Sequence, residues 1–317
     1  MADGHRVWRV VLAVVVGVLA LAGAAAPTTT ASGGEAPDRD VVGPVDVGDR
    51  QVYLECRGPS RLGRPTVVLI SGFGNAADIW SVVDPALVPP PEPVLPALAR
   101  TERVCAYDRP STLLTTDTVT DRSTPVPQPR SVGDWVTELH TLLSAAHVPG
   151  PYLLVGHSFG GLAARLYAST HPDEVAGLVL VDATNEELRT LLSPEQWAFL
   201  TSPPPAQGME GIDWDASFGQ VIAARTAVPL RPDLPLVVLS AGRFDELPPG
   251  LPDPEGVVRA QRAAQADLAR LVPGARQVVA EQSSHYVQVT EPGLIVGAVT
   301  AELRDLAASC PGTDGPR

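Results

Sequence analysis

The sequence predicts a single α/β domain built on a doubly wound, mostly parallel sheet. Seven short apolar runs follow one another along the chain, and most are continuous rather than alternating with polar residues. Continuous runs are typical of strands that are buried on both faces, as in a parallel sheet. We therefore expect strands at residues 51–56, 66–71, 103–107, 152–155, 177–181, 236–240 and 277–280.

Segments with helical periodicity lie between these runs. In residues 132–146 the apolar side chains, Trp135 and Leu139 among them, recur on one helical face. Residues 158–170 follow an expected strand directly, and residues 292–308 form the last expected helix. Strands that alternate with helices in this way predict helices on both faces of the sheet.

One long segment interrupts the alternation. Residues 184–233 separate two expected strands and carry aromatic residues of their own, including Trp197 and Trp214. A segment of this length is more than a simple connection. We interpret it as a small helical cap over the C-terminal edge of the sheet, with an irregular surface excursion as the alternative. The expected domain then spans residues 41–308, and a polar tail follows at 309–317.

The N-terminal segment has the order of regions found in a secretory signal peptide. Arg6 and Arg9 precede an apolar run at residues 10–21, and small residues follow it. This run is shorter than the ~20 residues that a membrane-spanning helix needs. We expect residues 1–26 to be a signal peptide, residues 27–40 to form a flexible leader, and the protein to be secreted or extracytoplasmic. An uncleaved N-terminal membrane anchor is the alternative.

The composition excludes several kinds of chemistry. The 317 residues carry a formal net charge of −13, which gives no electrostatic reason to expect nucleic acid or anionic lipid as a partner. All 23 residues counted as lysine or arginine are arginine, so no mechanism can use a lysine as Schiff base or general base. We expect a small-molecule substrate and neither a metal nor an organic cofactor.

The three cysteines, Cys56, Cys105 and Cys310, match no spacing of a metal site. Export would place them in an oxidising compartment, and their odd number leaves at least one outside any intrachain disulfide. Cys56 and Cys105 fall in expected strands, which favours two buried free thiols. A Cys56–Cys105 disulfide is the alternative.

The pentapeptide Gly156-His157-Ser158-Phe159-Gly160 is the motif that indicates chemistry. It lies between an expected buried strand and an expected helix, where a sharp turn lifts the serine hydroxyl above the sheet. The turn requires glycine because it brings neighbouring backbone very close. Backbone N–H groups at the start of the helix can hold developing negative charge. We predict that Ser158 is a catalytic nucleophile.

A serine hydroxyl is a poor nucleophile unless a base takes its proton. Among the six histidines of the chain, His285 follows the last expected strand and precedes the last expected helix. A loop at this point opens onto the same edge of the sheet as the serine turn. We predict that His285 acts as general base and later as general acid.

The third member of such a site is an acid that orients the imidazole and stabilises its charged form. It should lie between Ser158 and His285 in the chain and should follow a strand. Asp182 ends the expected strand 177–181, and Asp245 follows the next expected strand in a glycine-containing turn. We favour Asp245, with Asp182 as the alternative acid.

An oxyanion needs two backbone N–H donors. Phe159, directly after the serine, supplies one, and the loop after the expected strand 66–71 supplies the other. That loop contains Gly72-Phe73-Gly74, whose glycines leave the backbone free to approach a ligand. We predict that Phe73 is the second donor; a simple glycine turn is the alternative.

These motifs, in this order, resemble the α/β-hydrolase superfamily, and in particular its small-capped serine esterases and haloperoxidase-like enzymes. Residues 67–74, 103–110, 152–166 and 283–292 carry the resemblance, which extends from about residue 51 to residue 308. The resemblance implies a serine hydrolase that cleaves a carboxylic ester or related acyl bond through an acyl-enzyme, without a metal or organic cofactor.

Two positions depart from the family pattern. Ser71 stands where the family often has a histidine, but the donation there is by backbone. The interval of 40 residues from Asp245 to His285 is longer than usual for this step, which bears on the choice of the acid.

Two other functions are compatible with the pattern. A peptidase or amidase of the same fold would need acidic cap residues to select a peptide N-terminus, and Glu186 and Glu187 open the expected cap. A non-catalytic binding protein could also retain the fold. The intact set of serine, histidine and acid argues against this last function.

Overall fold

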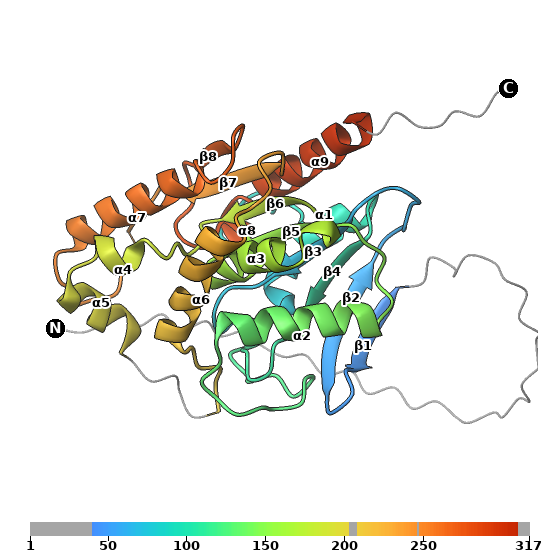
Figure 1. Cartoon of the computed structure of the whole chain (residues 1–317), viewed down its shortest axis with the longest axis horizontal. Coiled ribbons are helices and arrows are strands. Elements are labelled where there is room, and N and C mark those ends of the chain that lie inside the picture. The colour runs from blue at the N-terminus through green and yellow to red at the C-terminus, as the bar shows by residue number, and fades with distance from the viewer. Residues whose placement is uncertain (1–39, 203–207, 246, 310–317) are drawn as a thin grey trace, which may run out of the picture. The chain divides into compact units, whose positions relative to one another are not determined.

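A computed structural model describes residues 40–202, 208–245 and 247–309, which contain an eight-stranded sheet (Figure 1). The strand order is β1-β2-β4-β3-β5-β6-β7-β8. The β1–β2 and β2–β4 pairs are antiparallel, whereas all the other pairs are parallel. The predicted doubly wound, mostly parallel sheet is therefore confirmed. The strands are β1 (Val41–Asp46), β2 (Gln51–Arg57), β3 (Thr66–Ile70), β4 (Val104–Tyr107), β5 (Tyr152–His157), β6 (Val175–Val181), β7 (Leu236–Ala241) and β8 (Arg276–Ala280).

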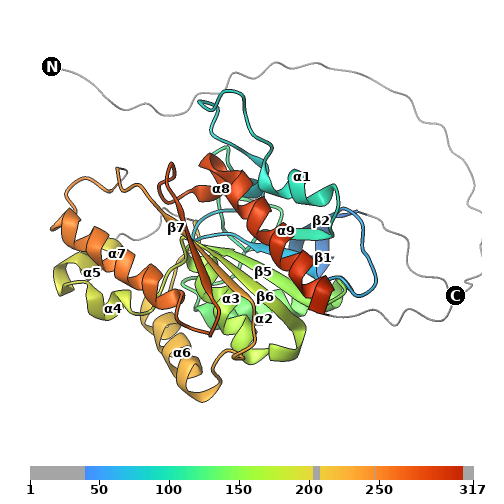
Figure 2. The ribbon, with the colours of Figure 1, turned by 90° about the horizontal axis from the view of Figure 1, so that it is seen from above.

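Helices cover both faces of this sheet (Figure 2). Helices α1 and α9 pack together on one face, where α9 also contacts β6 and β7. Helices α2, α3 and α6 pack together on the other face, with α3 against β5. The helices are α1 (Val94–Ala99), α2 (Val132–Ala145), α3 (Phe159–Thr170), α4 (Leu188–Leu191), α5 (Pro194–Thr201), α6 (Trp214–Ala227), α7 (Pro254–Leu268), α8 (Val287–Thr290) and α9 (Pro292–Ser309), with short 3-10 turns η1 (Ala77–Ser81) and η2 (Pro172–Glu174).

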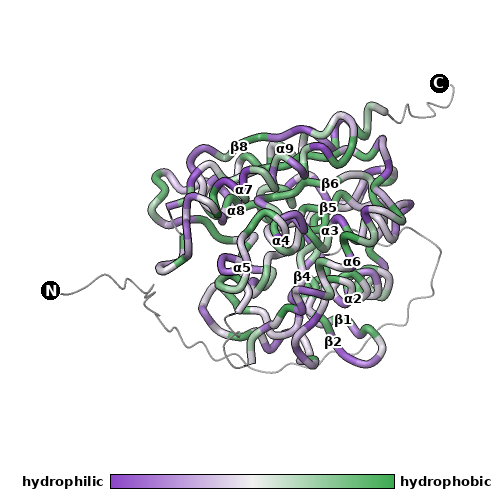
Figure 3. Tube along the Cα trace, turned by 60° about the vertical axis from the view of Figure 1, so that its left-hand side comes forward, coloured by the Kyte–Doolittle hydropathy of each residue, from purple (hydrophilic) through white to green (hydrophobic). Residues whose placement is uncertain are grey.

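The central strands are buried on both faces, as their continuous apolar sequences require. Along β5, Leu154 belongs to the apolar core that includes α2 and α3, whereas Leu153 and Val155 belong to the core that includes α1 and α9. The trace along β5 and β6 is accordingly hydrophobic (Figure 3). Successive residues of a strand point to opposite faces, so both cores depend on the same strands.

Strand β1 is an edge strand that the sequence did not indicate. Gly43 and Pro44 interrupt its apolar residues, and both residue types are depleted in strands. β1 pairs on one side only, with β2. Pro44 is tolerated there because an edge strand has one row of N–H groups outside the ladder.

The described part of residues 184–233 contains helices with two different sets of partners. Helix α4 packs against α7, where Leu188, Leu192 and Val257 share a small apolar cluster with the partly buried Trp197 of α5. Helix α6 instead packs against α2 and α3, so it joins the helical layer of the main sheet. The division of the chain into a domain and a cap stays a prediction.

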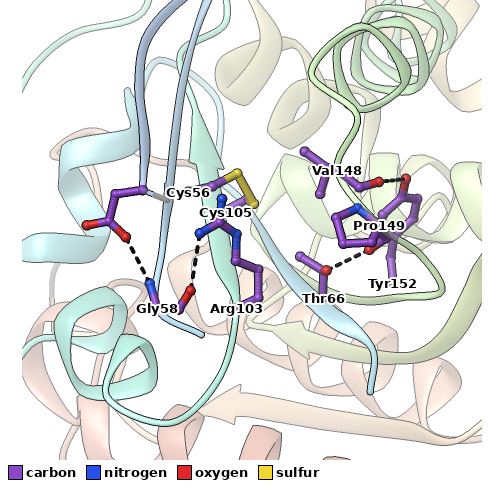
Figure 4. The surroundings of a disulfide bond; sticks show 9 residues. Cys56, Gly58, Thr66, Arg103, Cys105, Val148, Pro149 and Tyr152 are labelled. Atoms are coloured by element: carbon purple, nitrogen blue, oxygen red, sulfur yellow. Dashed lines mark hydrogen bonds between the residues drawn. A yellow bond between two sulfur atoms is a disulfide. The ribbon is translucent and has the colours of Figure 1, made fainter. Parts of the chain in front are cut away.

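A disulfide joins Cys56 of β2 to Cys105 of β4 (Figure 4). These residues lie directly opposite each other in the antiparallel β2–β4 pair, with their Cα atoms 4.0 Å apart. The expectation of two free thiols is therefore wrong. The register of β2 against β4 decides this pairing, and register is not visible in two cysteines that are 49 residues apart in the chain.

The expected signal peptide, most of the expected leader and Cys310 lie outside the described residues. Along the part of the chain that is described, no helix combines the length and the apolar character needed to cross a membrane.

Candidate active site

Four segments meet at the carboxyl edge of the parallel strands. These are the loop after β3, the turn after β5, the residue after β6 and the loop after β8, which carry Phe73, Ser158, Asp182 and His285. Parallel strands end at the same edge of a sheet, so residues from distant parts of the chain come together there.

Ser158 occupies a strained turn between β5 and α3. Its backbone has φ 51° and ψ −124°, and a positive φ is uncommon for residues other than glycine. Neighbouring strands hold the turn in place: the Ser158 N–H donates to Val181 O of β6 at 3.0 Å. On the other side, a Cβ on Gly160 would lie 2.3 Å from Ile70 O of β3. Residue 160 must therefore be glycine for the turn to pack against β3.

His285 bridges Ser158 and Asp182. Its Nε2 lies 3.0 Å from Ser158 Oγ, and its Nδ1 lies 2.7 Å from Asp182 Oδ2. The Asp182 side chain is only 7% exposed, and its other oxygen accepts a hydrogen bond from the Ala241 N–H. An imidazole that donates from Nδ1 to a carboxylate presents Nε2 as the acceptor for the serine hydroxyl.

Asp245, the acid favoured from the sequence, lies outside this arrangement. Its side chain is 52% exposed and ion-pairs with Arg243, whose hydrogen bond lowers the pKa of the Asp245 carboxyl. The preference for Asp245 over Asp182 as the partner of His285 is therefore wrong. The loop after β7 instead supports the loop that carries His285, since the Arg243 N–H donates to Ser283 O.

The position of β6 explains why Asp182 meets the histidine. β6 lies between β5 and β7, so its carboxyl end is next to the serine turn. The loop after β8 must pass the end of β7 to bring His285 to this point. Asp182 directly follows the last residue of its strand. That immediate attachment to a strand was the signal in the sequence that pointed to Asp182.

Of the two residues predicted as oxyanion donors, Phe159 directly follows Ser158, and Phe73 follows a glycine that packs against it. Phe159 is the first residue of α3, where an N–H has no partner within the helix. A Cβ on Gly72 would lie 2.9 Å from Ser158 Cβ, so the residue before Phe73 packs against the serine. The rings of Phe159 and Phe73 both contact Trp214 of α6, with centroid distances of 5.4 Å and 6.4 Å.

His157 is buried and supports the loop after β8, which carries His285. Its Nε2 lies 2.9 Å from His285 O, and its Nδ1 lies 3.3 Å from Gln288 Nε2. Burial, together with the adjacent His285 imidazole, holds the pKa of His157 well below 6.5. A neutral His157 can donate from Nε2 to the backbone of the residue that bridges Ser158 and Asp182. The sequence carried no sign of this contact between His157 and the loop after β8.

One group of potential metal ligands lies elsewhere in the described residues. His140, His171 and Glu174 offer ligand atoms within 4.8 Å of one another. The two imidazole rings are stacked with 6° between their planes, and Glu174 already contacts both His140 and the Tyr167 hydroxyl. Lone pairs in parallel rings do not converge on one point, so this arrangement is not that of a metal site. The expected independence from metals and cofactors stays a prediction.

The sequence matches the model of the alpha/beta hydrolase family over residues 67–308, and the chain belongs to this family. The matched region includes Ser158, Asp182 and His285. The family resemblance drawn from the motifs is thereby confirmed.

Curated relatives match parts of the chain. A protein named "Putative carbamate hydrolase RutD" from Yersinia enterocolitica is 31% identical over 133 residues, which are 42% of this chain and 41% of the relative. A "Probable transporter efuK" from Hormonema carpetanum is 26% identical over 177 residues, which are 54% of this chain and 23% of the relative. The chain therefore spans less than half the length of each of these relatives.

Solved structures share the fold at low sequence identity. A putative lipase from Acinetobacter baumannii AYE has a TM-score of 0.56 at 18% identity, covering 85% of this chain and 93% of that one. An enol-lactonase from Burkholderia xenovorans LB400 has a TM-score of 0.53 at 18% identity, covering 82% of this chain and 99% of that one. At this identity the likeness concerns the fold alone.

The depressed pKa of His157 predicts a loss of stability in acid. The unfolded chain takes up a proton on this residue near pH 6.5, whereas the folded protein does not until its lower pKa is reached. The free energy of unfolding should therefore fall as the pH drops below about 6.5. In His157→Gln the fall should be shallower by up to ~1.4 kcal/mol per pH unit. Chemical denaturation over a pH series measures both slopes, and equal slopes would contradict the assignment.

Proposed function

We propose that this protein is a serine hydrolase that cleaves a carboxylic ester or a related acyl bond, with Ser158, His285 and Asp182 as its triad. The observation that carries the proposal is the pair of His285 contacts, 3.0 Å to Ser158 Oγ and 2.7 Å to Asp182 Oδ2. A histidine with a purely structural role would not need a hydroxyl in a strained turn on one side and a nearly buried carboxylate on the other. Membership in the alpha/beta hydrolase family supports hydrolytic chemistry.

The proposed reaction has two steps. Ser158 Oγ attacks the carbonyl carbon while His285 Nε2 takes the serine proton, and Asp182 stabilises the resulting imidazolium. The N–H groups of Phe73 and Phe159 hold the negative charge on the carbonyl oxygen. His285 then protonates the leaving alcohol. In the second step His285 takes a proton from water, which attacks the acyl-enzyme, and then gives this proton to Ser158 Oγ as the acid is released.

The exposure of the site supports direct access by a substrate. The His285 side chain is 40% exposed, although Asp182 behind it is nearly buried. Phe73 in the loop after β3 and Tyr286 next to His285 also have exposed side chains. An ester can therefore approach Ser158 from solvent, with the imidazole already at hydrogen-bonding distance from the nucleophile.

The peptidase or amidase alternative has less support. It relied on the carboxylates at the start of the expected cap to bind a peptide N-terminus. Glu186 is buried and accepts two hydrogen bonds from Arg165, at 2.7 Å and 2.8 Å, and another from Arg225. Its charge is therefore compensated within the protein, which leaves it little attraction for an ammonium group.

The first prediction from this proposal concerns the nucleophile. The purified protein should be labelled by a fluorophosphonate probe and should hydrolyse p-nitrophenyl acetate or butyrate. Ser158→Ala should abolish both signals, because Ser158 carries the hydroxyl that lies 3.0 Å from His285 Nε2. Mass spectrometry of the labelled peptide checks the position. A wild-type protein that neither reacts with the probe nor hydrolyses short acyl esters would refute the proposal.

The second prediction separates the two candidate acids. Asp182→Asn should lower kcat by about 10³- to 10⁴-fold, since an amide cannot stabilise the imidazolium or enforce the required tautomer. Asp245→Asn is the matched control and should remain within about twofold of the wild type, because this carboxylate is exposed and contacts Arg243 rather than His285. Steady-state kinetics on one ester, with thermal unfolding to verify folding, decides between them. A large fall of kcat in Asp245→Asn with little change in Asp182→Asn would instead identify Asp245 as the acid.

The third prediction concerns location. We propose that the protein is exported and loses residues 1–26, and the Cys56–Cys105 disulfide supports an oxidising compartment. Cells that express the full chain should release a shortened protein into the extracytoplasmic fraction, with an N-terminus that sequencing identifies. Recovery of the intact chain in the membrane fraction would instead favour the N-terminal anchor, and recovery in the cytoplasm would contradict export.

A further inference from the structure

We propose that the buried pair Arg109–Glu210 positions the oxyanion-binding backbone, which makes both of them positioning residues for hydrolysis. The segment concerned is residues 71–75, here called the oxyanion loop. The inference rests on the proposed function, because it assigns a task to this loop in the same reaction. Neither residue touches the reacting atoms.

Arg109 binds the oxyanion loop through its guanidinium. The residue follows β4, and its side chain has no exposed surface. Nη1 donates to Ser71 O at 2.9 Å, and Nη2 donates to Gly72 O at 2.7 Å. The guanidinium also lies over the Trp135 ring, 3.8 Å from its centroid, which fixes its plane. Two consecutive carbonyl groups of the loop are thus held by one rigid group.

Glu210 binds the same loop and completes the pair. Its carboxylate accepts from Arg109 Nε at 2.7 Å and from Arg109 Nη2 at 3.1 Å. One of its oxygens also accepts from the Gly74 N–H at 2.9 Å. The carboxylate is fully buried, and the Glu210 N–H donates to Ser111 O. Glu210 therefore neutralises Arg109 and holds a third peptide group of the loop.

Peptide geometry extends this control to the predicted oxyanion donor. The bond between Gly72 and Phe73 is trans, so the Gly72 carbonyl and the Phe73 N–H point in opposite directions. The carbonyl points at Arg109, and the Phe73 N–H therefore points away from the buried pair. Gly72 itself packs against Ser158, where a Cβ would lie 2.9 Å from Ser158 Cβ. The direction of the Phe73 N–H at the serine is thus set by the carbonyl that Arg109 holds.

Substitution of either Arg109 or Glu210 is expected to destabilise the surrounding structure. Removal of one buried charge leaves the other without compensation, and the remaining group then seeks water or new partners. The loop is the structure most directly attached to both groups, through the peptide groups of residues 71, 72 and 74. Glu210 belongs to the segment that precedes α6, within residues 184–233. The expected cap segment therefore supplies the acid that fixes the oxyanion loop.

The test compares Glu210→Gln with a matched control. Glutamine keeps the shape and one acceptor oxygen but leaves Arg109 unpaired. Glu138→Gln is the control, because Glu138 is equally buried but is paired with Arg130 and Arg50, neither of which is hydrogen-bonded to the oxyanion loop in the described part of the chain. In Glu210→Gln, kcat for p-nitrophenyl acetate should fall by about 10- to 100-fold with little change in KM, as expected for a misaligned oxyanion donor. The affinity for a boronic acid inhibitor should fall in parallel. Glu138→Gln should lose stability without this change in kcat.

Arg109→Lys provides a second variant that keeps the charge. A lysine ammonium cannot hold two carbonyl groups and a carboxylate in one plane, so the same fall in kcat is expected. Hydrogen exchange of the peptide that contains residues 71–75 reports on the loop independently of activity. Exchange there should be faster in Glu210→Gln than in both the wild type and Glu138→Gln.

The outcomes are distinguishable from a failure of the proposed function. An active wild type with unchanged kcat in Glu210→Gln, or an equal fall of kcat in the Glu138→Gln control, overturns the inference but not the hydrolase. An inactive wild type overturns the proposed function, and the exchange experiment still decides whether the pair holds the loop. Unchanged exchange in residues 71–75 overturns the positioning role in either case.

Discussion

The turn at Ser158 is the constraint on which the site depends. Its positive φ is unfavourable for serine, and it persists because the turn is packed between two strands. The Ser158 N–H donates to Val181 O on one side, and Gly160 approaches Ile70 O too closely for any side chain on the other. The same two strands lead into Asp182 and into the oxyanion loop. Packing that stabilises the turn therefore also brings Asp182 and the predicted oxyanion donors to this edge of the sheet.

A second set of buried polar contacts holds the loops of this arrangement. His157 binds the backbone of His285, and the loop after β7 binds Ser283 just before it. Arg109 and Glu210 hold the oxyanion loop through its peptide groups. Each loop that carries a proposed catalytic or oxyanion-binding group is thus held through its backbone. Backbone attachment leaves the side chains of His285 and Phe73 partly exposed toward a substrate.

Local patterns in the chain were sufficient for most of the fold. Apolar runs indicated the strands from β2 to β8. These runs are continuous where a strand is buried on both faces, as in β3, β4, β5 and β7, whereas the edge strand β8 is mostly exposed. Strand β1 was missed because Gly43 and Pro44 are residue types that are rare in strands. They are tolerated here because β1 lies at the edge of the sheet. The Cys56–Cys105 disulfide was not preferred because it depends on the register between β2 and β4. Register is a relation between two segments, and neither segment carries it alone.

The sequence by itself determined the family, the nucleophile candidate Ser158 and the histidine that reaches it, since each lies in a local strand–turn or strand–loop context. The tertiary structure decided which acid meets His285. Asp182 and Asp245 both follow strands, and the choice depends on β6 lying next to β5 while the loop after β8 passes the end of β7. The tertiary structure also decided that Glu210 pairs with Arg109, which lies 101 residues earlier in the chain. No sequence motif around Glu210 indicated this pairing. Contacts between segments so far apart arise from the order and packing of the strands, which no local pattern contains.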